Sequence, residues 1–193
     1  NLINNTNTII IKPSYKKYND YFSDNESNKI AKLDLDLIIR LDFRITKGKI
    51  LNSCKYGIWS FHHGDNAKYR GGPAGFWEVL SNENLTGVTL QVLNDILDGG
   101  KIIEKGFYNT QWSYIKNYNY ISEKSILLFK KNIRLLYNNK FNYKSSNISD
   151  SLIYKKPKFF DLIKYISIIL NKILIKIFKK LFIKLSRYRI LFD

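Results

Sequence analysis

The distribution of glycine constrains this chain more than any other feature of its sequence. All ten glycines lie between Gly48 and Gly106. Glycine is required where the backbone turns tightly or approaches a ligand closely. Both histidines, His62 and His63, and the aromatic residue Trp77 fall in the same segment. We therefore expect the functional part of the chain to lie within this glycine-containing segment.

Apolar runs before this segment predict two strands. Residues 8–11 form a short β-branched run that ends before Pro13, which is typical of a strand. Residues 37–39 form a continuous apolar run after a polar stretch, which favours a buried parallel strand. The polar residues 20–28 between them are predicted to form a loop.

The glycine-containing segment predicts alternating strands and a helix. Residues 56–61 indicate a second buried strand, and a polar loop follows at residues 62–72. Pro73 stands where a helix can begin, and residues 74–80 supply that helix. Two further strands are expected, at residues 86–93 and 101–107. This order indicates an α/β sheet that carries its site at the strand ends.

The C-terminal third is expected to be helical. Residues 122–137 place Ile126, Phe129, Ile133 and Leu136 on one helical face, which completes a predicted catalytic domain at residues 1–137. The polar residues 138–158 are interpreted as a linker. Residues 159–193 place lysines at helical spacing among apolar residues, and these runs are too short to span a bilayer. The alternatives are a basic amphipathic helix on a membrane surface, or a helix that packs on this domain or on an absent one.

Composition adds three weaker expectations. The net charge of +16 favours anionic partners, although abundant Lys, Asn and Ile can also reflect the base composition of a gene. The single cysteine, Cys54, excludes an internal disulfide and fits a reducing, cytoplasmic location. The sequence contains no methionine, even at position 1, so we expect a fragment or a chain trimmed at its front end.

Two polar strings follow the predicted strands and carry the chemistry. The first runs from Ser60 through His62 and His63 to the glycines at 71–72, and the second delivers Asp98 before Gly99 and Gly100. A histidine and an aspartate at neighbouring strand ends suit acyl or formyl transfer, in which the histidine stabilises an oxyanion or handles a proton. Surface histidines and a turn carboxylate remain the alternative interpretation.

Two other chemistries are disfavoured. A serine nucleophile requires a glycine two positions to either side of the serine, and Ser60 lacks that pattern. A metal site is disfavoured because adjacent residues on an extended segment point in opposite directions, so His62 and His63 cannot both face one ion. We therefore predict no metal site.

Residues 36–107 resemble the folate-dependent formyltransferase family, which includes the glycinamide ribonucleotide and methionyl-tRNA enzymes. His62 falls on the family histidine, residues 68–71 (Lys-Tyr-Arg-Gly) on the end of the family loop, residues 87–89 (Gly-Val-Thr) on a family strand, and Asp98 on the family aspartate. The resemblance implies a Rossmann-like core with a helical C-terminal extension. About two strand–helix units of that core are missing at the N-terminal side. The His-His-Gly-Asp-Asn variant resembles a branch concerned with surface glycoconjugates.

One departure from the family concerns catalysis. Ser60 stands where the family has an asparagine that hydrogen-bonds the formyl oxygen, and a serine hydroxyl donates only one bond. Asn66 in the loop is a candidate for the missing amide. The predicted catalytic residues are therefore His62, Asp98, Ser60 and Asn66.

The resemblance also implies where the ligands bind. The pterin ring of folate would lie against residues 41–45 and 94–98, so the expected cofactor-binding residues are Leu41, Phe43, Ile45, Asn94 and Asp95. The expected substrate-binding residues are His63, Asp65, Lys68 and Arg70, of which the two cations would face a phosphate or carboxylate. Lys68 and Arg70 as solvated surface cations remain the alternative.

The predicted activity is transfer of a formyl group from 10-formyltetrahydrofolate to an amine, most simply an amino sugar or its nucleotide conjugate. Initiator methionyl-tRNA is the alternative acceptor, which the positive charge suits. However, the residues after 138 lack the pattern of an RNA-binding barrel, so nucleic acid is disfavoured. A third hypothesis is a non-catalytic remnant whose basic tail binds a membrane or a partner.

Overall fold

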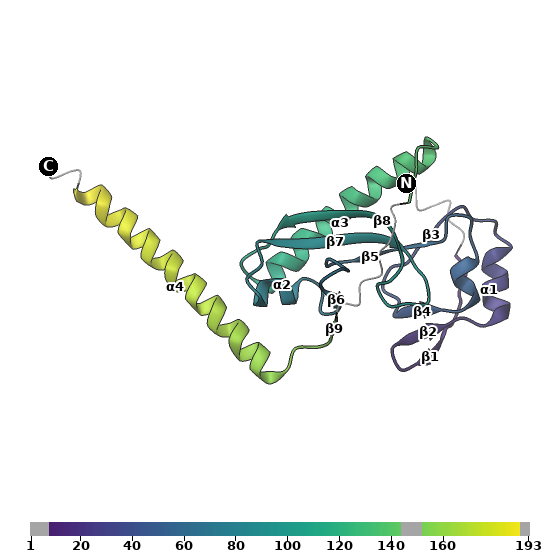
Figure 1. Cartoon of the computed structure of the whole chain (residues 1–193), viewed down its shortest axis with the longest axis horizontal. Helices are drawn as coiled ribbons and strands as arrows, with labels where there is room; N and C mark the ends of the chain where they lie inside the picture. Colours follow the sequence, from purple (N-terminus) through teal and green to yellow (C-terminus); the bar gives the residue numbers. More distant parts are fainter. Residues whose placement is uncertain (1–7, 144–151, 190–193) are drawn as a thin grey trace.

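The structure is a computed structural model that describes residues 8–143 and 152–189, with side chains described up to residue 183. It is a mixed α/β protein, which confirms the predicted fold class (Figure 1). The elements in chain order are β1 (Ser14–Lys16), β2 (Asn19–Tyr21), α1 (Asp24–Ala31), β3 (Ile38–Ile39), β4 (Ile45–Lys47), the 3-10 helix η2 (Lys49–Asn52), β5 (Ile58–His62), β6 (Arg70–Gly71), α2 (Phe76–Leu80), β7 (Leu85–Val92), β8 (Lys101–Asn109), α3 (Tyr114–Tyr137), β9 (Ile153–Tyr154) and α4 (Phe159–Arg189).

The central sheet has the order β3-β5-β7-β8. All four strands were predicted, and each lies within about two residues of its expected bounds. β3 pairs with β5 in parallel, as predicted, whereas β5–β7 and β7–β8 are antiparallel. The prediction that β3 is buried is wrong, because β3 is an edge strand and Ile39 is 41% exposed.

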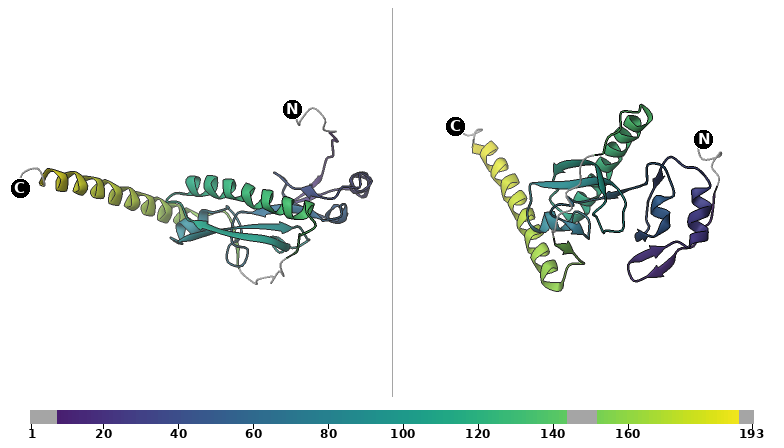
Figure 2. Two further views of the ribbon diagram at one scale, coloured as in Figure 1. Left: turned by 90° about the horizontal axis from the view of Figure 1, so that it is seen from above. Right: turned by 45° about the vertical axis from the view of Figure 1, so that its right-hand side comes forward.

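Helix α3 covers one face of this sheet (Figure 2). Its Phe129, Ile133 and Leu136 pack against Trp59 and other fully buried residues of the strands. Burial of such side chains stabilises the fold by roughly 2–3 kcal/mol each. The prediction for Ile126 is wrong, since it is 51% exposed.

Helix α3 also begins at Tyr114, eight residues before the predicted start. The polar Asn117 in its first turns hid this start from the apolar pattern. Asn117 is fully buried, and its amide is bonded to Gly75, Thr86 and Gln111. A buried polar residue with satisfied hydrogen bonds therefore belongs to the inner face of the helix.

Two predictions for the N-terminal part are wrong. Residues 8–11 form no strand, and residues 20–28 are not a loop but the end of β2 and most of α1. α1 starts at a capping box, in which the Ser23 side chain accepts from the Glu26 N–H and the Glu26 carboxylate accepts from the Ser23 N–H. This motif supplies hydrogen bonds that the polar composition alone did not reveal. β2 pairs with β4, so this part lies beside the central sheet as a separate small sheet (Figure 1).

The segment interpreted as a linker, residues 138–158, takes part in packing. Phe141 stacks on Trp59 with ring centroids 5.1 Å apart, and β9 pairs in parallel with β6. Gly71 in β6 has φ +86°, and a Cβ there would overlap the Tyr154 carbonyl oxygen. Glycine is thus required for this pairing. Residues 144–151 lie outside the described part.

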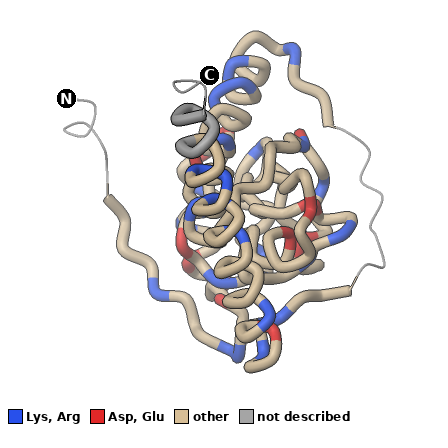
Figure 3. The backbone as a smooth tube through the Cα atoms, turned by 90° about the vertical axis from the view of Figure 1, so that its left-hand side faces the viewer, with Lys and Arg blue, Asp and Glu red and all other residues tan. Residues whose placement is uncertain are grey.

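Helix α4 extends away from the core (Figures 1 and 2). It contacts the core near its start, where Tyr165 packs on Phe76 and its hydroxyl accepts from the Tyr114 N–H at 3.0 Å. Lysine and arginine positions recur along α4 and over the core (Figure 3). Across residues 8–143 and 152–189, no helix has the length and apolarity needed to cross a bilayer. Predicted residues 190–193, and the side chains of Lys184 and Arg187, lie outside the described part.

Candidate functional site

The pairing of β5 with β7 sorts their side chains onto two faces. Ser60 lies opposite Gln91 and His62 lies opposite Thr89 in the antiparallel register. Residues opposite each other, and residues two positions apart on one strand, share a face of a sheet. These four polar side chains therefore face away from α3, whereas the apolar residues between them pack beneath it.

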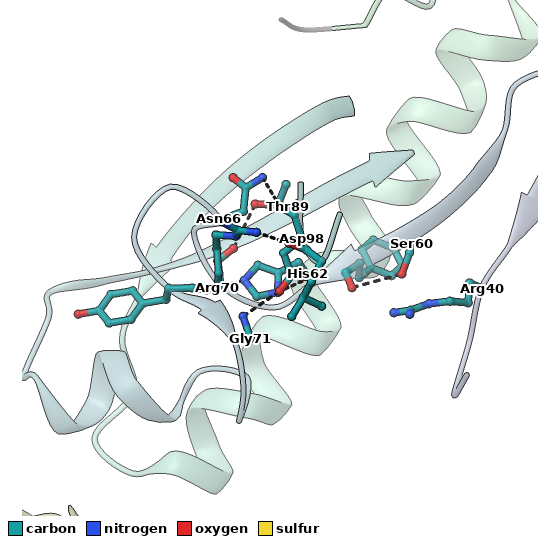
Figure 4. A network of polar contacts seen from close by, with 12 residues as sticks. Arg40, Ser60, His62, Asn66, Arg70, Gly71, Thr89 and Asp98 are labelled. Carbon is teal, nitrogen blue, oxygen red and sulfur yellow. Dashed lines mark hydrogen bonds and ion pairs between the residues drawn. The ribbon is translucent and has the colours of Figure 1, made fainter. Parts of the chain in front are cut away.

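His62 is held at the end of β5 by two partners (Figure 4). Its Nε2 lies 2.6 Å from the Tyr69 carbonyl oxygen, and its Nδ1 lies 3.4 Å from Asp98 Oδ1. The side chains of His62 and Asp98 are only 7% and 13% exposed. Gly64 makes this arrangement possible, since a Cβ there would lie 2.7 Å from His62 Nε2.

These contacts define the hydrogen positions on the imidazole. A carbonyl oxygen only accepts, so Nε2 donates to Tyr69. An ionised carboxylate also only accepts, so Nδ1 faces Asp98 favourably when it too carries a hydrogen. Nε2 is thus engaged by a backbone carbonyl, whereas the contact of Nδ1 with Asp98 Oδ1, at 3.4 Å, is longer than an ordinary hydrogen bond, so Nδ1 is the ring atom that remains to interact with a ligand.

Asp98 is placed by the backbone around it. Its φ is +51°, a left-handed conformation that aspartate tolerates better than most residues. Its Oδ2 accepts from the Gly71 N–H at 2.8 Å. Two side chains of the first polar string also hold this turn: Asn66 Nδ2 donates to the Asp98 carbonyl at 3.3 Å, and Arg70 Nη2 donates to the Leu97 carbonyl at 2.7 Å.

A cavity of about 280 Å³ opens beside this pair. Its lining residues come from β4 and the segment before it, from the end of β5, from β6 and the segment after it, and from the end of β7 and the turn that follows: Arg40, Phe43, Arg44, Ile45, Thr46, Phe61, His62, His63, Gly71, Ala74, Gln91, Leu93, Asn94, Ile96, Leu97 and Asp98. The volume is close to the lower end of small-molecule sites, roughly 300 Å³. Six sequence-predicted residues thus meet here, namely His62, His63, Asp98, Phe43, Ile45 and Asn94.

Four predicted residues lie next to the cavity without lining it. Ser60 is 1% exposed, and its Oγ donates to the neighbouring Phe61 carbonyl at 3.4 Å. Asn66 and Arg70 direct their side-chain donors to the carbonyls of Asp98 and Leu97. Leu41 is 65% exposed, so it does not contribute an apolar wall.

The other predicted residues lie elsewhere. Asp95 offers its carbonyl oxygen to Lys47 Nζ at 2.7 Å, and its side chain does not line the cavity. Asp65 and Lys68 line a second cavity of about 270 Å³, where they pair with Lys105 and Glu83 at 2.7 and 2.5 Å. The structure therefore does not bring them to the His62–Asp98 pair.

His63 directs its ring towards Ser125 of α3, whereas His62 faces away from that helix, although both residues line the cavity. Its ring stacks near Phe61 and lies 3.3 Å from Ser125 Oγ. The Ser125 hydroxyl donates its single hydrogen to the Ser122 carbonyl, so His63 Nε2 is the donor of this pair. Burial, with a further contribution from His62, lowers the pKa of His63 to about 4, so the ring is neutral at pH 7.

Two polar side chains of the cavity were not predicted as site residues. Gln91 is 2% exposed, and its Oε1 has no hydrogen-bond partner among the described residues. The same holds for Arg40 Nε; burial lowers the pKa of Arg40, while Asp98 and Asp20 oppose this effect. The available signal for Gln91 was a polar residue on an apolar strand, two positions after Thr89.

Within the described ranges, no group of three or more His, Cys, Asp and Glu side chains is arranged to hold a metal ion.

No family model matches the chain. Curated methionyl-tRNA formyltransferases match parts of it. Methionyl-tRNA formyltransferase of Bacillus licheniformis is 33% identical over 81 residues, 42% of this chain and 26% of the relative. That of Prochlorococcus marinus is 30% identical over 129 residues, 63% and 38% of the two chains. The matches thus span well under half of each relative's length.

Solved structures share the fold. An N-formyltransferase from Helicobacter canadensis, solved with folinic acid and dTDP-3-aminofucose, aligns with a TM-score of 0.52 and 24% identity over 68% of this chain and 54% of its own. A sugar N-formyltransferase from Shewanella aligns with a TM-score of 0.58 and 16% identity, over 74% of this chain and 63% of its own. HypX from Aquifex aeolicus aligns with a TM-score of 0.60 and 16% identity, over 76% of this chain and 28% of its own. In fold, and in sequence over part of its length, this chain resembles the formyltransferase family.

Proposed function

We propose that this chain transfers a formyl group from 10-formyltetrahydrofolate to the amino group of a sugar. The observation that carries the proposal is the contact between buried His62 and partly buried Asp98 at the wall of the cavity. In the reaction, the amine nitrogen forms a bond to the formyl carbon, and the carbonyl oxygen becomes an oxyanion. The bond from that carbon to N10 then breaks, and a proton from the amine passes to N10.

His62 Nδ1, whose resting contact with Asp98 Oδ1 is 3.4 Å, donates to the oxyanion, while Nε2 stays on the Tyr69 carbonyl and Asp98 holds the imidazole in place. The proton leaves the amine through a water next to Asp98. The ring system of the folate lies against Phe43, Ile45 and Asn94, which line the same cavity. A cavity of this size accommodates the pterin and the reacting group, while the remainder of the folate extends outwards.

An amino sugar on a nucleotide carrier is the favoured acceptor. The solved relative from Helicobacter canadensis holds dTDP-3-aminofucose, and Arg40 and Arg44 line the cavity as cations for an anionic ligand. Initiator methionyl-tRNA is the second candidate, favoured by the curated sequence matches. An acceptor screen that contains a dTDP-amino sugar and charged initiator tRNA distinguishes the two.

Calorimetry with a stable 10-formyl folate analogue, 10-formyl-5,8-dideazafolate, tests the donor site. We expect saturable binding by the full chain and weaker binding by Asp98→Asn, which keeps the shape and removes the charge. Asp34→Asn is the matched control, because Asp34 is exposed and also has a left-handed backbone, with φ +48°. No binding by the folded wild-type chain would overturn the proposal and favour the non-catalytic interpretation.

A second proposal concerns α4, which we infer binds an anionic membrane surface. One stripe of this helix is apolar and exposed, and it consists of Ile166, Leu170, Ile173, Leu174, Ile177 and Leu181. Lysines lie on the rest of its surface, together with further exposed apolar residues such as Ile175 and Phe182, and Asp161 is the only acidic residue in the described part of the helix. Such a helix lies in a membrane interface. Sedimentation with vesicles tests it: binding to phosphatidylserine vesicles that is lost in Leu170→Asp supports it, and no binding overturns it.

A further inference from the structure

The reaction proposed above needs a hydrogen-bond donor that Ser60 does not supply. Family members place an asparagine at this position, as the sequence resemblance indicates. Here the Ser60 hydroxyl is 1% exposed, donates to the Phe61 carbonyl and does not line the cavity. The predicted substitute, Asn66, directs its amide nitrogen to the Asp98 carbonyl instead. Neither predicted residue therefore presents a free amide to the cavity.

Gln91 lies directly opposite Ser60 in the β5–β7 pair, on the same face of the sheet as His62. Side chains of opposite residues start only about 4.5–5.5 Å apart, measured between Cβ atoms. A glutamine on β7 thus reaches the space that a longer side chain at position 60 would have occupied. Unlike Ser60, Gln91 lines the cavity.

The carboxamide of Gln91 is not satisfied within the described part of the protein. The side chain is 2% exposed, yet its Oε1 has no hydrogen-bond partner there. An unsatisfied polar atom in such a position costs roughly 1–3 kcal/mol. Rotation about the terminal bond of a glutamine exchanges Oε1 and Nε2, so this group can meet either a donor or an acceptor on a ligand.

The surroundings of Gln91 leave room for it. Gly100 lies beside its amide, and a Cβ at position 100 would come within 3.2 Å of Gln91 Oε1. Arg40 lines the same cavity, and its Nε also lacks a partner among the described residues. Two unpaired polar atoms in the lining of one cavity indicate that a polar ligand group binds there.

We propose that Gln91 is a catalytic residue, whose carboxamide Nε2 donates to the formyl oxygen of the donor in place of the family asparagine. This inference rests on the formyl transfer proposed above. As the amine nitrogen bonds to the formyl carbon, Gln91 and His62 both donate to the growing oxyanion. The bond to N10 then breaks, the carbonyl re-forms, and the proton lost by the amine ends on N10.

The test uses two variants and a matched control in the full chain. Gln91→Glu keeps the shape and removes the N–H donors, while Gln91→Leu removes all hydrogen bonding from a buried position. Gln111→Leu is the control, since Gln111 is the other glutamine of the chain and its Nε2 donates to the Asn109 carbonyl away from the cavity. Circular dichroism establishes that each variant is folded.

The first readout is the affinity that the formyl group adds. Calorimetry compares 10-formyl-5,8-dideazafolate with 5,8-dideazafolate, which lacks the formyl group. We expect the wild type and Gln111→Leu to bind the formyl compound several-fold more tightly than its parent. In both Gln91 variants that preference disappears, while affinity for the parent stays within about twofold. A merely structural role would weaken both ligands equally.

The second readout is turnover of 10-formyltetrahydrofolate, which is expected to fall on the order of 10²- to 10³-fold in both variants, the effect of removing one oxyanion donor. Adding Ser60→Asn to Gln91→Leu restores an amide from the neighbouring strand and part of the rate. If the wild type binds folate and turns over, and both Gln91→Leu and Gln91→Glu keep that binding and turnover, the proposed role of Gln91 is overturned while the proposed function stands. Absence of folate binding in the wild type would instead remove the proposed function, and this inference with it.

Discussion

His62 and Asp98 come from two different segments, yet Nδ1 of the one lies 3.4 Å from Oδ1 of the other; the His62 side chain is buried, and that of Asp98 is 13% exposed. The antiparallel register sets His62 opposite Thr89 and the last residue of β7, Val92, opposite Trp59, so the turn after β7 folds back along the sheet to bring Asp98 to His62. The Tyr69 carbonyl and the Gly71 N–H fix the far sides of the imidazole and the carboxylate. The pair is therefore held as a unit, which leads to the first prediction.

The losses of activity caused by replacing His62 and by replacing Asp98 are not expected to be additive. His62→Leu removes the donor to the oxyanion, and Asp98→Asn removes the charge that holds it, so each lowers kcat by roughly 10²-fold. The double variant is expected to fall little further, because residues that act as one unit share one contribution. Steady-state kinetics of the four proteins measures this coupling. Independent, multiplying losses would show that the two residues act separately.

The neutral state of His63 predicts a dependence of stability on pH. Burial lowers the pKa of His63 to about 4 from its ordinary value of 6.5. As the pH falls, the unfolded chain therefore takes up a proton before the folded chain does, and stability is lost between about pH 6.5 and 4. From pH 7 to pH 5 this amounts to about 2 kcal/mol. Urea unfolding of wild type and His63→Gln measures it, and an equal loss in both proteins would contradict the prediction.

Glu78 makes the opposite contribution. It is 2% exposed, and burial, with smaller effects of Glu83 and Asp65, raises its pKa to about 7. The pKa of Glu78 in the folded chain lies above its unfolded value of 4.5. The free energy of unfolding is therefore highest at low pH, where Glu78 is neutral, and falls as the pH rises through 7. Glu78→Gln is therefore expected to raise the free energy of unfolding by about 3 kcal/mol at pH 8.

The same variant is expected to show no gain at pH 4, where the carboxyl group of Glu78 is already neutral. Thermal unfolding at the two pH values provides the comparison. The neighbouring Glu83 offers a control, because its contact with Lys68 lowers its pKa, so Glu83→Gln is not expected to stabilise the protein at pH 8. A gain for Glu78→Gln that is the same at both pH values would point to packing rather than to ionisation.

Asn117 joins α3 to the start of α2 and to the sheet. Its Nδ2 donates to the Gly75 carbonyl at 2.9 Å, and its Oδ1 accepts from the Gln111 N–H at 2.9 Å. Asn117→Ala leaves these buried groups unsatisfied, so we expect a loss of about 2–4 kcal/mol in the free energy of unfolding. Asn138→Ala, at an exposed position after α3, is expected to change stability by less than about 0.5 kcal/mol. Denaturant titration compares the two variants.

Local patterns predicted the central part of this protein well. The strands of the central sheet were predicted from short apolar runs bounded by turn residues, because such runs indicate segments that are buried. The N-terminal part was harder, because α1 depends on a capping box at Ser23 within a polar stretch, and β2 depends on pairing with β4. The early start of α3 was hidden for a related reason, since Asn117 is buried only because its partners lie far away in the sequence.

The sequence alone singled out His62 and Asp98, because His62 ends a strand pattern, Asp98 precedes Gly99 and Gly100, and both residues fall on the pattern that the chain shares with the formyltransferase family. Only the tertiary structure decided which side chains share the cavity. It excluded Ser60, Asp65 and Lys68 from the cavity lining and added Gln91 to it. The physical reason is strand register, because the pairing of Ser60 with Gln91 depends on hydrogen bonds between distant segments, which no single stretch of sequence contains.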